Sequence, residues 1–103
     1  MTALIDRIRD AHVAIRPHVL VSPLQRSDAL SDALGCDLWL KCDHLQPTGS
    51  FKLRGATNKV RLLAPDHEEV FTASTGNHGR AVAHAAAAFG IGATVYVNDS
   101  APQ

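Results

Sequence analysis

Residues 69–97 read EVFTASTGNHGRAVAHAAAAFGIGATVYV, and this stretch decides the fold. Two short apolar runs, 69–73 and 93–97, flank an alanine-rich segment, 78–89, which is followed by Gly90. The apolar runs are typical of buried strands, and an alanine-rich segment that ends at a glycine is typical of a helix. Such a connection is almost always a right-handed crossover, so the two strands are predicted to lie parallel in one sheet.

The preceding residues extend this alternation. Residues 37–42, DLWLKC, predict a strand, and residues 43–50 predict a loop because they contain a proline and a glycine. A helix is predicted over 51–63, with Ser50 as its N-cap. The order over 37–97 is therefore β-α-β-α-β. It predicts an α/β fold of three layers, in which a three-stranded parallel sheet carries helices on its faces.

Shorter elements are predicted before this unit. The apolar positions of 2–16 recur at helical spacing, with Thr2 as a candidate N-cap. Residues 19–21 predict an extended piece that is broken by a proline. A short helix is then predicted from a cap at Ser27 to a stop at Gly35.

Composition limits the class of protein. The chain has 103 residues, 46% of them hydrophobic and 19% charged, which fits one globular domain and excludes disorder. Ten basic and ten acidic residues give zero net charge, so we expect neither nucleic acid nor a membrane as a partner. No signal-peptide pattern is present, and a cytoplasmic location is expected. Cys36 and Cys42 are expected to be free thiols, and the histidine spacing predicts no metal site.

Ligands of open α/β sheets bind where strands end and helices begin, and two loops of this chain occupy that place. The first loop, QPTGSFK at 46–52, brings hydroxyls, N–H groups and Lys52 to the first turn of a helix. The helix dipole disfavours a cation there, which suits the neutral amine of Schiff-base chemistry. A solvated lysine with no further role is the alternative. Gly55 costs this helix about 1 kcal/mol relative to alanine, which indicates close packing or the approach of a ligand.

The second loop, STGNHG at 74–79, places two hydroxyls, an amide and several N–H groups at the start of a helix. This arrangement suits a carboxylate or a phosphate. The alternative is simple helix capping by Ser74 or Asn77, with Gly76 in a turn conformation. The patterns GxxxxGK[ST], GxGxxG and GxSxG of phosphate loops, dinucleotide sites and hydrolases are all absent.

Together the two loops resemble motifs of the fold type II pyridoxal-phosphate enzymes. KCDHLQPTGSFKLRGA at 41–56 is similar to the lysine motif of that family, and TASTGNHG at 72–79 to its substrate-carboxylate loop. The resemblance runs from about Ser22 to the end of the chain. SFKLRGA is most similar to the threonine and serine dehydratase branch, which includes serine racemase. Cysteine and threonine synthases more often have aspartate at the position of Leu53.

The resemblance implies the fold of the tryptophan synthase β subunit, pyridoxal 5′-phosphate as cofactor, and roles for individual residues. Lys52 would bind the cofactor as a Schiff base and then act as the base on the substrate Cα. Phe51 would lie beside the cofactor ring, and Asn77 would form a hydrogen bond to the 3′-oxygen of the cofactor. Thr75 is a catalytic candidate, because racemases of this branch have a serine there that acts as acid and base. The loop that holds the substrate carboxylate would consist of Ser74, Thr75, Gly76, Asn77 and His78.

The implied reaction removes the β-hydroxyl of threonine or serine and yields a 2-oxo acid and ammonia. Three other activities of the family stay open: hydroxyaspartate dehydratase, serine racemase and β-replacement synthase. A non-catalytic anion-binding α/β module, in which Lys52 is only structural, is the alternative outside enzymes. Asp43 departs from the glutamate usual in the family, a change expected to affect local packing.

The resemblance covers roughly the first third of the family's catalytic chain. We therefore expect residues 1–103 to be the truncated N-terminal part of a catalytic domain, with the phosphate cradle further downstream. The isolated chain is expected to be inactive and unstable. A small amino acid is the expected substrate, and the full-length enzyme is expected to be a homo-oligomer.

Overall fold

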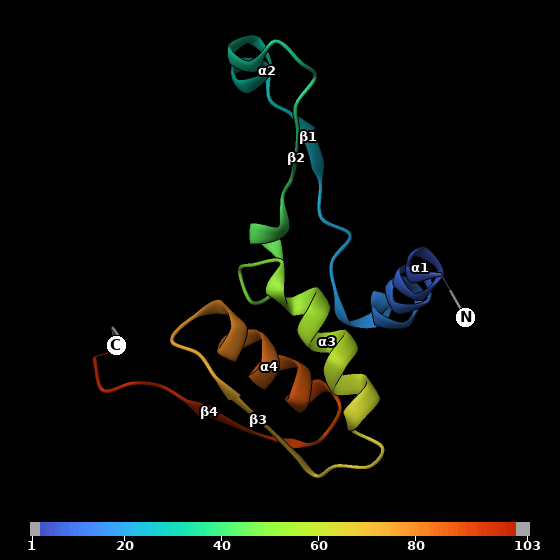
Figure 1. Cartoon of the computed structure of the whole chain (residues 1–103), viewed down its shortest axis with the longest axis vertical. Coiled ribbons are helices and arrows are strands. Elements are labelled where there is room, and N and C mark those ends of the chain that lie inside the picture. The colour runs from blue at the N-terminus through green and yellow to red at the C-terminus, as the bar shows by residue number, and fades with distance from the viewer. Residues whose placement is uncertain (1–2, 101–103) are drawn as a thin grey trace.

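The computed structural model describes residues 3–100 of the chain (Figure 1). Thr2, the candidate cap of the first helix, lies outside these residues. The elements along the chain are α1 (Leu4–Ile15), a 3₁₀ turn (Arg16–His18), β1 (Leu24–Arg26), α2 (Asp28–Leu34), β2 (Trp39–Lys41), a second 3₁₀ turn (Asp43–Leu45), α3 (Lys52–Leu63), β3 (Glu69–Ala73), α4 (Asn77–Ala88) and β4 (Gly92–Tyr96).

The unit β3-α4-β4 forms as the sequence predicts. β3 and β4 pair in parallel, with a register that runs from Glu69 opposite Gly92 to Ala73 opposite Tyr96. α4 packs against both strands, and α3 packs against α4. Gly90 follows α4 with a positive φ of 71°, a conformation that glycine adopts without strain. The α/β class is therefore confirmed for this half of the chain.

Two apolar clusters hold the helices in place. The first joins α3, β3 and α4. The second is smaller and joins Leu53 of α3 to Ile15 and Val19, so it attaches α1 and the segment after it to the start of α3. Leu53 is fully buried. The buried members of the first cluster are Ala56, Val60, Val70, Ala81, Val82, Ala85 and Ala86.

The prediction of a third parallel strand at 37–42 is wrong. β2 occupies only Trp39–Lys41, and it pairs antiparallel with β1 at Leu24–Arg26. Residues 19–21 belong to no strand, although Val19 has the extended backbone expected there, and β1 begins after Pro23. An apolar run predicts a strand but does not identify its partner, because pairing depends on contacts between distant residues.

β1, α2 and β2 form an arm that extends away from the rest of the molecule (Figure 1). Ser27 caps α2 as predicted, because its hydroxyl accepts a hydrogen bond from the Leu30 N–H. Gly35 ends the helix with a φ of 66°, also as predicted. Arg26 forms an ion pair with Asp37 across the base of α2, at 2.9 Å. These local contacts shape the arm without a buried apolar cluster of its own among the described residues.

Large apolar side chains are exposed on the arm and on the sheet formed by β3 and β4. Phe71 of β3 and Tyr96 of β4 are each more than 60% exposed. No helix in residues 3–100 has the length and apolar character needed to cross a membrane. The exposed apolar residues of the arm include Leu24, Leu30, Leu34, Trp39 and Leu40.

Leu53→Ala is expected to lower the free energy of unfolding by about 2–5 kcal/mol, because it opens a cavity in a fully buried contact. Leu62 lies on the same helix but is 56% exposed, so Leu62→Ala is the matched control and should change stability by less than about 1 kcal/mol. Urea denaturation of the complete polypeptide measures both. Equal losses would contradict the assignment of Leu53 to the core.

Candidate active site

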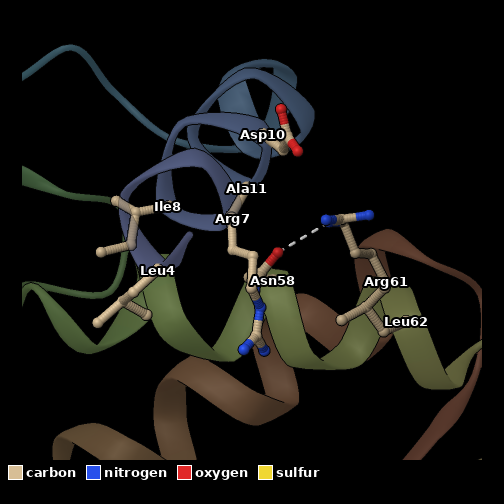
Figure 2. A pocket seen from close by; sticks show the side chains of 8 residues that line it. All are labelled: Leu4, Arg7, Ile8, Asp10, Ala11, Asn58, Arg61 and Leu62. Carbon is tan, nitrogen blue, oxygen red and sulfur yellow. Dashed lines mark hydrogen bonds between the residues drawn. The ribbon is translucent and has the colours of Figure 1, made fainter. Parts of the chain in front are cut away.

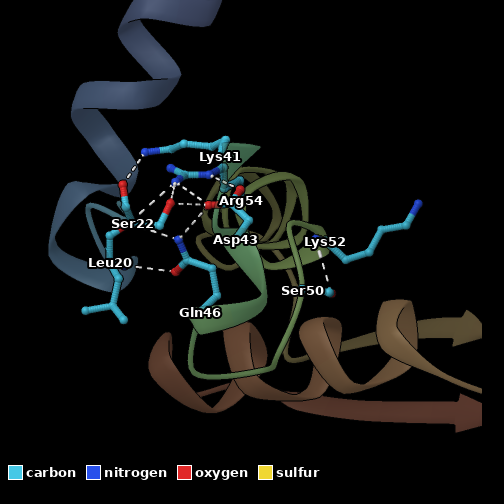
Figure 3. Close-up of polar contacts among 8 residues, drawn as sticks. All are labelled: Leu20, Ser22, Lys41, Asp43, Gln46, Ser50, Lys52 and Arg54. Atoms are coloured by element: carbon cyan, nitrogen blue, oxygen red, sulfur yellow. Dashed lines mark hydrogen bonds and ion pairs between the residues drawn. The ribbon is translucent and has the colours of Figure 1, made fainter. Parts of the chain in front are cut away.

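Lys52 is the first residue of α3, and its side chain is exposed. Its Nζ lies 5.1 Å from the centre of the Phe51 ring, a cation–π distance. No carboxylate among residues 3–100 forms an ion pair with this amine. Figure 3 shows the side chain extending toward the end of the molecule where the arrows of β3 and β4 terminate. The amine is therefore available to a ligand at the carboxyl ends of the strands.

The two lysines nearest in sequence are placed differently. Lys41 donates a hydrogen bond from Nζ to the Ser22 carbonyl at 2.6 Å, so its amine is already engaged. Lys59 lies two turns further along α3. Among these three, only Lys52 combines a free amine with a helix N-terminus.

The loop before Lys52 is held by local hydrogen bonds. The Gly49 N–H donates to the Gln46 carbonyl at 2.7 Å, and Gly49 has a positive φ of 76°. The prediction that Ser50 is the N-cap of α3 is wrong: the helix begins at Lys52, and Phe51 occupies the cap position without a side-chain hydrogen bond. The buried Ser50 hydroxyl instead accepts a long hydrogen bond of 3.4 Å from the Lys52 N–H.

The second loop leads from β3 into α4. The Ser74 N–H donates to the Tyr96 carbonyl at 3.0 Å, which extends the pairing of the two strands by one residue. The Ser74 hydroxyl accepts from the Gly76 N–H at 3.2 Å. Thr75, Gly76, Asn77 and His78 are all exposed.

The start of α4 is open to an anion. Gly76 occupies the cap position, and no side chain caps the helix. The alternative of capping by Ser74 or Asn77 is therefore not observed, since the Ser74 hydroxyl bonds only the N–H of Gly76 itself. The first N–H groups of a helix have no partner within it and carry the positive end of the helix dipole. A carboxylate placed beside this loop would therefore meet several unpaired donors.

Packing of α3 against α4 holds the loops at 46–52 and 74–79 in a fixed relation, because each loop leads into one of these helices. Gly55 of the first motif and His78 of the second line one groove, which also includes Val60, Phe71 and Val82. The expectation of close packing at Gly55 is wrong, because a Cβ there would have no atom within 4 Å. The other expectation, approach of a ligand, is compatible with this open space.

Gly79 is a site residue that the sequence analysis did not single out. A Cβ at this position would lie 2.7 Å from Cγ1 of Val95 and 3.3 Å from Cβ of Ser74. Gly79 therefore allows the first turn of α4 to approach β4 and the loop closely. Its place in the first turn of a helix that follows a strand is the signal that could have identified it.

Asp43 and Arg54 form the most connected ion pair of the described residues. Nε and Nη2 of Arg54 donate to the two carboxylate oxygens of Asp43, at 2.8 and 2.9 Å. Ser22 and Gln46 also donate to Oδ1 of Asp43. The side-chain amide of Gln46 accepts a hydrogen bond from the Leu20 N–H at Oε1 and donates one from Nε2 to the Leu20 carbonyl, each at 2.9 Å. We call Leu20, Ser22, Lys41, Asp43, Gln46 and Arg54 the junction network (Figure 3).

Asp43 and Arg54 each stabilise the charged form of the other. The Arg54 guanidinium holds the pKa of the Asp43 carboxyl well below its ordinary value, aided by the Ser22 and Gln46 hydrogen bonds and opposed by burial. Asp43 in turn raises the pKa of Arg54. Because the carboxyl pKa is lower in the folded protein than in the unfolded chain, the pair stabilises the fold fully above about pH 4 and less as the pH falls further.

A pocket between α1 and α3 contains none of the predicted site residues (Figure 2). On its α3 side, Nε of Arg61 donates to Oδ1 of Asn58 at 3.0 Å. No group of three His, Cys, Asp or Glu side chains within residues 3–100 is placed to hold a metal ion. The pocket is lined by Leu4, Arg7, Ile8, Asp10, Ala11, Asn58, Arg61 and Leu62.

A free lysine amine and an uncapped helix start, both set on an α/β scaffold, are features shared by enzymes that hold a carbonyl cofactor covalently. Residues 15–103 match the family described as pyridoxal-phosphate dependent enzyme, and the chain belongs to this family. The family uses pyridoxal phosphate, as the two motifs predicted.

Individual relatives cover different reactions. A Sinorhizobium fredii protein, provisionally named a threonine dehydratase, is 45% identical over 101 residues, which are 96% of this chain and 30% of that protein. A β-hydroxyaspartate dehydratase of Paracoccus denitrificans is 41% identical over 90% of this chain and 30% of its own. The solved structure of maize serine racemase superposes with a TM-score of 0.87 and 38% identity, over 99% of this chain and 32% of that one. The chain thus spans about a third of the length of these relatives. The family match and the superposition on serine racemase confirm the predicted fold type II.

The residues present fit the cofactor. An aldehyde needs a primary amine that it can reach, and Lys52 provides an exposed one with an aromatic ring beside it. Asn77, as the first residue of α4, places an exposed amide at the neighbouring loop. Free donors at the start of α4 suit the carboxylate of an amino acid.

Gly79→Ala is expected to destabilise the protein by about 1–3 kcal/mol and to weaken amino-acid binding, because the added methyl group forces α4 away from β4 and the loop. Gly55→Ala is the matched control: it has open space and should stabilise α3 by up to about 1 kcal/mol. Thermal unfolding of the complete polypeptide measures both. A Gly79→Ala variant as stable as the parent protein would contradict the close approach.

Proposed function

We propose that this chain forms the N-terminal third of the catalytic domain of a pyridoxal-phosphate dependent lyase. The proposed reaction converts threonine or serine to a 2-oxo acid and ammonia. The match to about 30% of each relative's length supports the partial domain. The exposed apolar residues of the arm and sheet support it as well, since such surfaces are normally covered.

The exposed, unpaired amine of Lys52 at the start of α3 is the observation that carries this proposal. A solvated lysine without a role would be equally acceptable at any outer position of the helix. At the first turn the helix dipole opposes a cation, so its presence there calls for a chemical reason. Binding an aldehyde through this amine supplies that reason and disfavours the non-catalytic module.

When bound, pyridoxal phosphate acts as an electron sink for the charge that develops on the substrate Cα. Nζ of Lys52 would hold the cofactor, and as a neutral amine it could take the proton from the substrate Cα. Phe51 would lie beside the cofactor ring, and the Asn77 amide would donate to the 3′-oxygen, as the family resemblance implies. The loop Ser74–His78 orients the substrate through its carboxylate, with the N–H groups at the start of α4 as donors.

Two residues bear on the choice among related activities. Leu53 is fully buried against Ile15 and Val19, a position that an aspartate could occupy only at a large energetic cost. This favours the dehydratase and racemase branch over the β-replacement synthases. Thr75 offers an exposed hydroxyl beside the start of α4, which keeps serine racemization as the second candidate. Assays for 2-oxo acid and for D-serine, with serine, threonine and β-hydroxyaspartate as substrates, distinguish these activities.

The surroundings of the complete enzyme are part of the same proposal. Its substrate is a small amino acid, and no nucleic acid or membrane takes part. We further propose that the complete enzyme is a cytoplasmic homo-oligomer. Size-exclusion chromatography with light scattering tests the oligomeric state.

Lys52 is predicted to be the one lysine of this chain that binds the cofactor covalently. Borohydride reduction of the complete enzyme with pyridoxal phosphate, followed by peptide mapping, should place the label on Lys52 and not on Lys41 or Lys59. Lys41 is held by the Ser22 carbonyl, and Lys59 lies two turns from the helix start. The Lys52→Ala variant should take no label, and a label on Lys41 or Lys59 would contradict the assignment.

Asn77→Ala is expected to lower turnover by about tenfold or more, because one hydrogen bond to a charged oxygen is worth about 1.5–3 kcal/mol. The absorbance spectrum of the bound cofactor should change as well. Ala83→Ser, on the exposed face of the same helix, serves as the control and should leave both unchanged. Unaltered turnover and spectrum in Asn77→Ala would count against its proposed role.

A further inference from the structure

The first turn of α3 is packed through the buried side chain of Leu53 but lacks the usual polar stabilisation of a helix start. No side chain caps the helix, and its first turn contains no acidic residue. It carries two cations instead, Lys52 at the first position and Arg54 at the third. Positive charge at this end is opposed by the helix dipole, so a negatively charged group nearby is needed to compensate it.

Asp43 is that group. It lies in the second 3₁₀ turn, which precedes the loop that leads into α3. Its two carboxylate oxygens accept hydrogen bonds from Nε and Nη2 of Arg54. The side chains of Arg54 and Asp43 are only 26% and 13% exposed, so the pair is far less solvated than the ion pairs of the arm. A two-point contact with a planar guanidinium also fixes the orientation of the arginine, which a single contact would not.

The pair is in turn fixed by two other segments. The Ser22 hydroxyl donates a hydrogen bond to the Asp43 carboxylate. The buried side-chain amide of Gln46 forms hydrogen bonds with the N–H and the carbonyl of Leu20 and also donates to Asp43. Nη2 of Arg54 also approaches the Leu20 carbonyl at 3.5 Å. The segment after α1, the 3₁₀ turn and α3 therefore meet at this one carboxylate.

Lys52 and Arg54 point in opposite directions from the helix. Successive residues of an α-helix are rotated by about 100°, so residues two apart lie about 200° apart around the axis. Figure 3 shows the Lys52 side chain extending from the side of α3 opposite to the junction network. Fixing Arg54 on one side thus sets the rotation of the first turn, and with it the direction of the Lys52 amine on the other.

We infer that the Asp43–Arg54 ion pair is a positioning device for the Lys52 amine, one that sets the orientation of the first turn of α3. This inference rests on the proposed function of Lys52. Neither residue touches the cofactor or the substrate in this scheme. Loss of the pair slows the reaction of Lys52 with the aldehyde, whereas an ion pair that only stabilised the fold would leave that reaction unchanged in the folded protein.

The test compares three variants of the complete polypeptide. Asp43→Asn removes the charge, and Asp43→Glu keeps the carboxylate and is the rescue variant. Asp37→Asn is the matched control, because Asp37 pairs with Arg26 on the arm, where the two side chains are 78% and 39% exposed. The rate at which Lys52 takes up added pyridoxal phosphate is measured by borohydride trapping and peptide mapping. Urea denaturation confirms that each variant is folded under the conditions of the assay.

Asp43→Asn is expected to slow labelling of Lys52 by about tenfold, the effect of losing one hydrogen bond to a charged group. Asp43→Glu should restore most of the rate, and Asp37→Asn should leave it unchanged. A folded Asp43→Asn protein that is labelled at the parental rate would overturn the inference. If Asp43→Asn does not fold, Arg54→Lys takes its place, because it keeps the charge but loses the two-point contact. Labelling of Lys52 in Arg54→Lys should then be slowed by about the same factor of ten, and a parental rate would overturn the inference.

Hydrogen exchange separates this inference from the proposed function. In the cofactor-free protein, Asp43→Asn should accelerate exchange at the amides of Lys52, Leu53 and Arg54 but not in the second half of α4. If the parent protein takes no label at Lys52, the proposed function fails, and exchange alone then decides whether the pair controls the turn. Unaltered exchange at these three amides would refute the inference in either case.

Discussion

The two-point contact between Asp43 and Arg54 is the interaction on which the arrangement of the candidate site depends. A partly buried carboxylate that accepts several hydrogen bonds is costly to leave without its partners. Here one carboxylate joins the segment after α1, the 3₁₀ turn and α3. The start of α3, and therefore the direction of Lys52, follows from this contact.

The second half of the site depends on close packing instead of charge. Gly79 brings the first turn of α4 against Val95 and Ser74, and the backbone of Ser74 is bonded to Tyr96. The loop that leads into α4 is thereby held against the end of the sheet. Because α3 also packs on α4, the lysine loop and the carboxylate loop belong to one packed unit.

The exposed surfaces agree with the family assignment. The relatives are about three times as long as this chain, and the two-stranded sheet and the arm both expose large apolar side chains. An enzyme that binds pyridoxal phosphate also needs donors for its phosphate, and the family resemblance assigns these to residues beyond the first third. The described part therefore provides the covalent attachment point and the substrate loop of the proposed site.

The sequence by itself determined the unit β3-α4-β4, the caps of α2 at Ser27 and Gly35, and the two motifs that identify the family. These features are written in local patterns: apolar periodicity, glycine positions and the spacing of a short motif. It did not determine the partner of β2, the roles of Gly55 and Gly79, or the connections of Asp43. Only the tertiary structure decided these, because strand pairing, the space around a Cβ and the partners of a buried carboxylate all depend on residues that are distant in the chain.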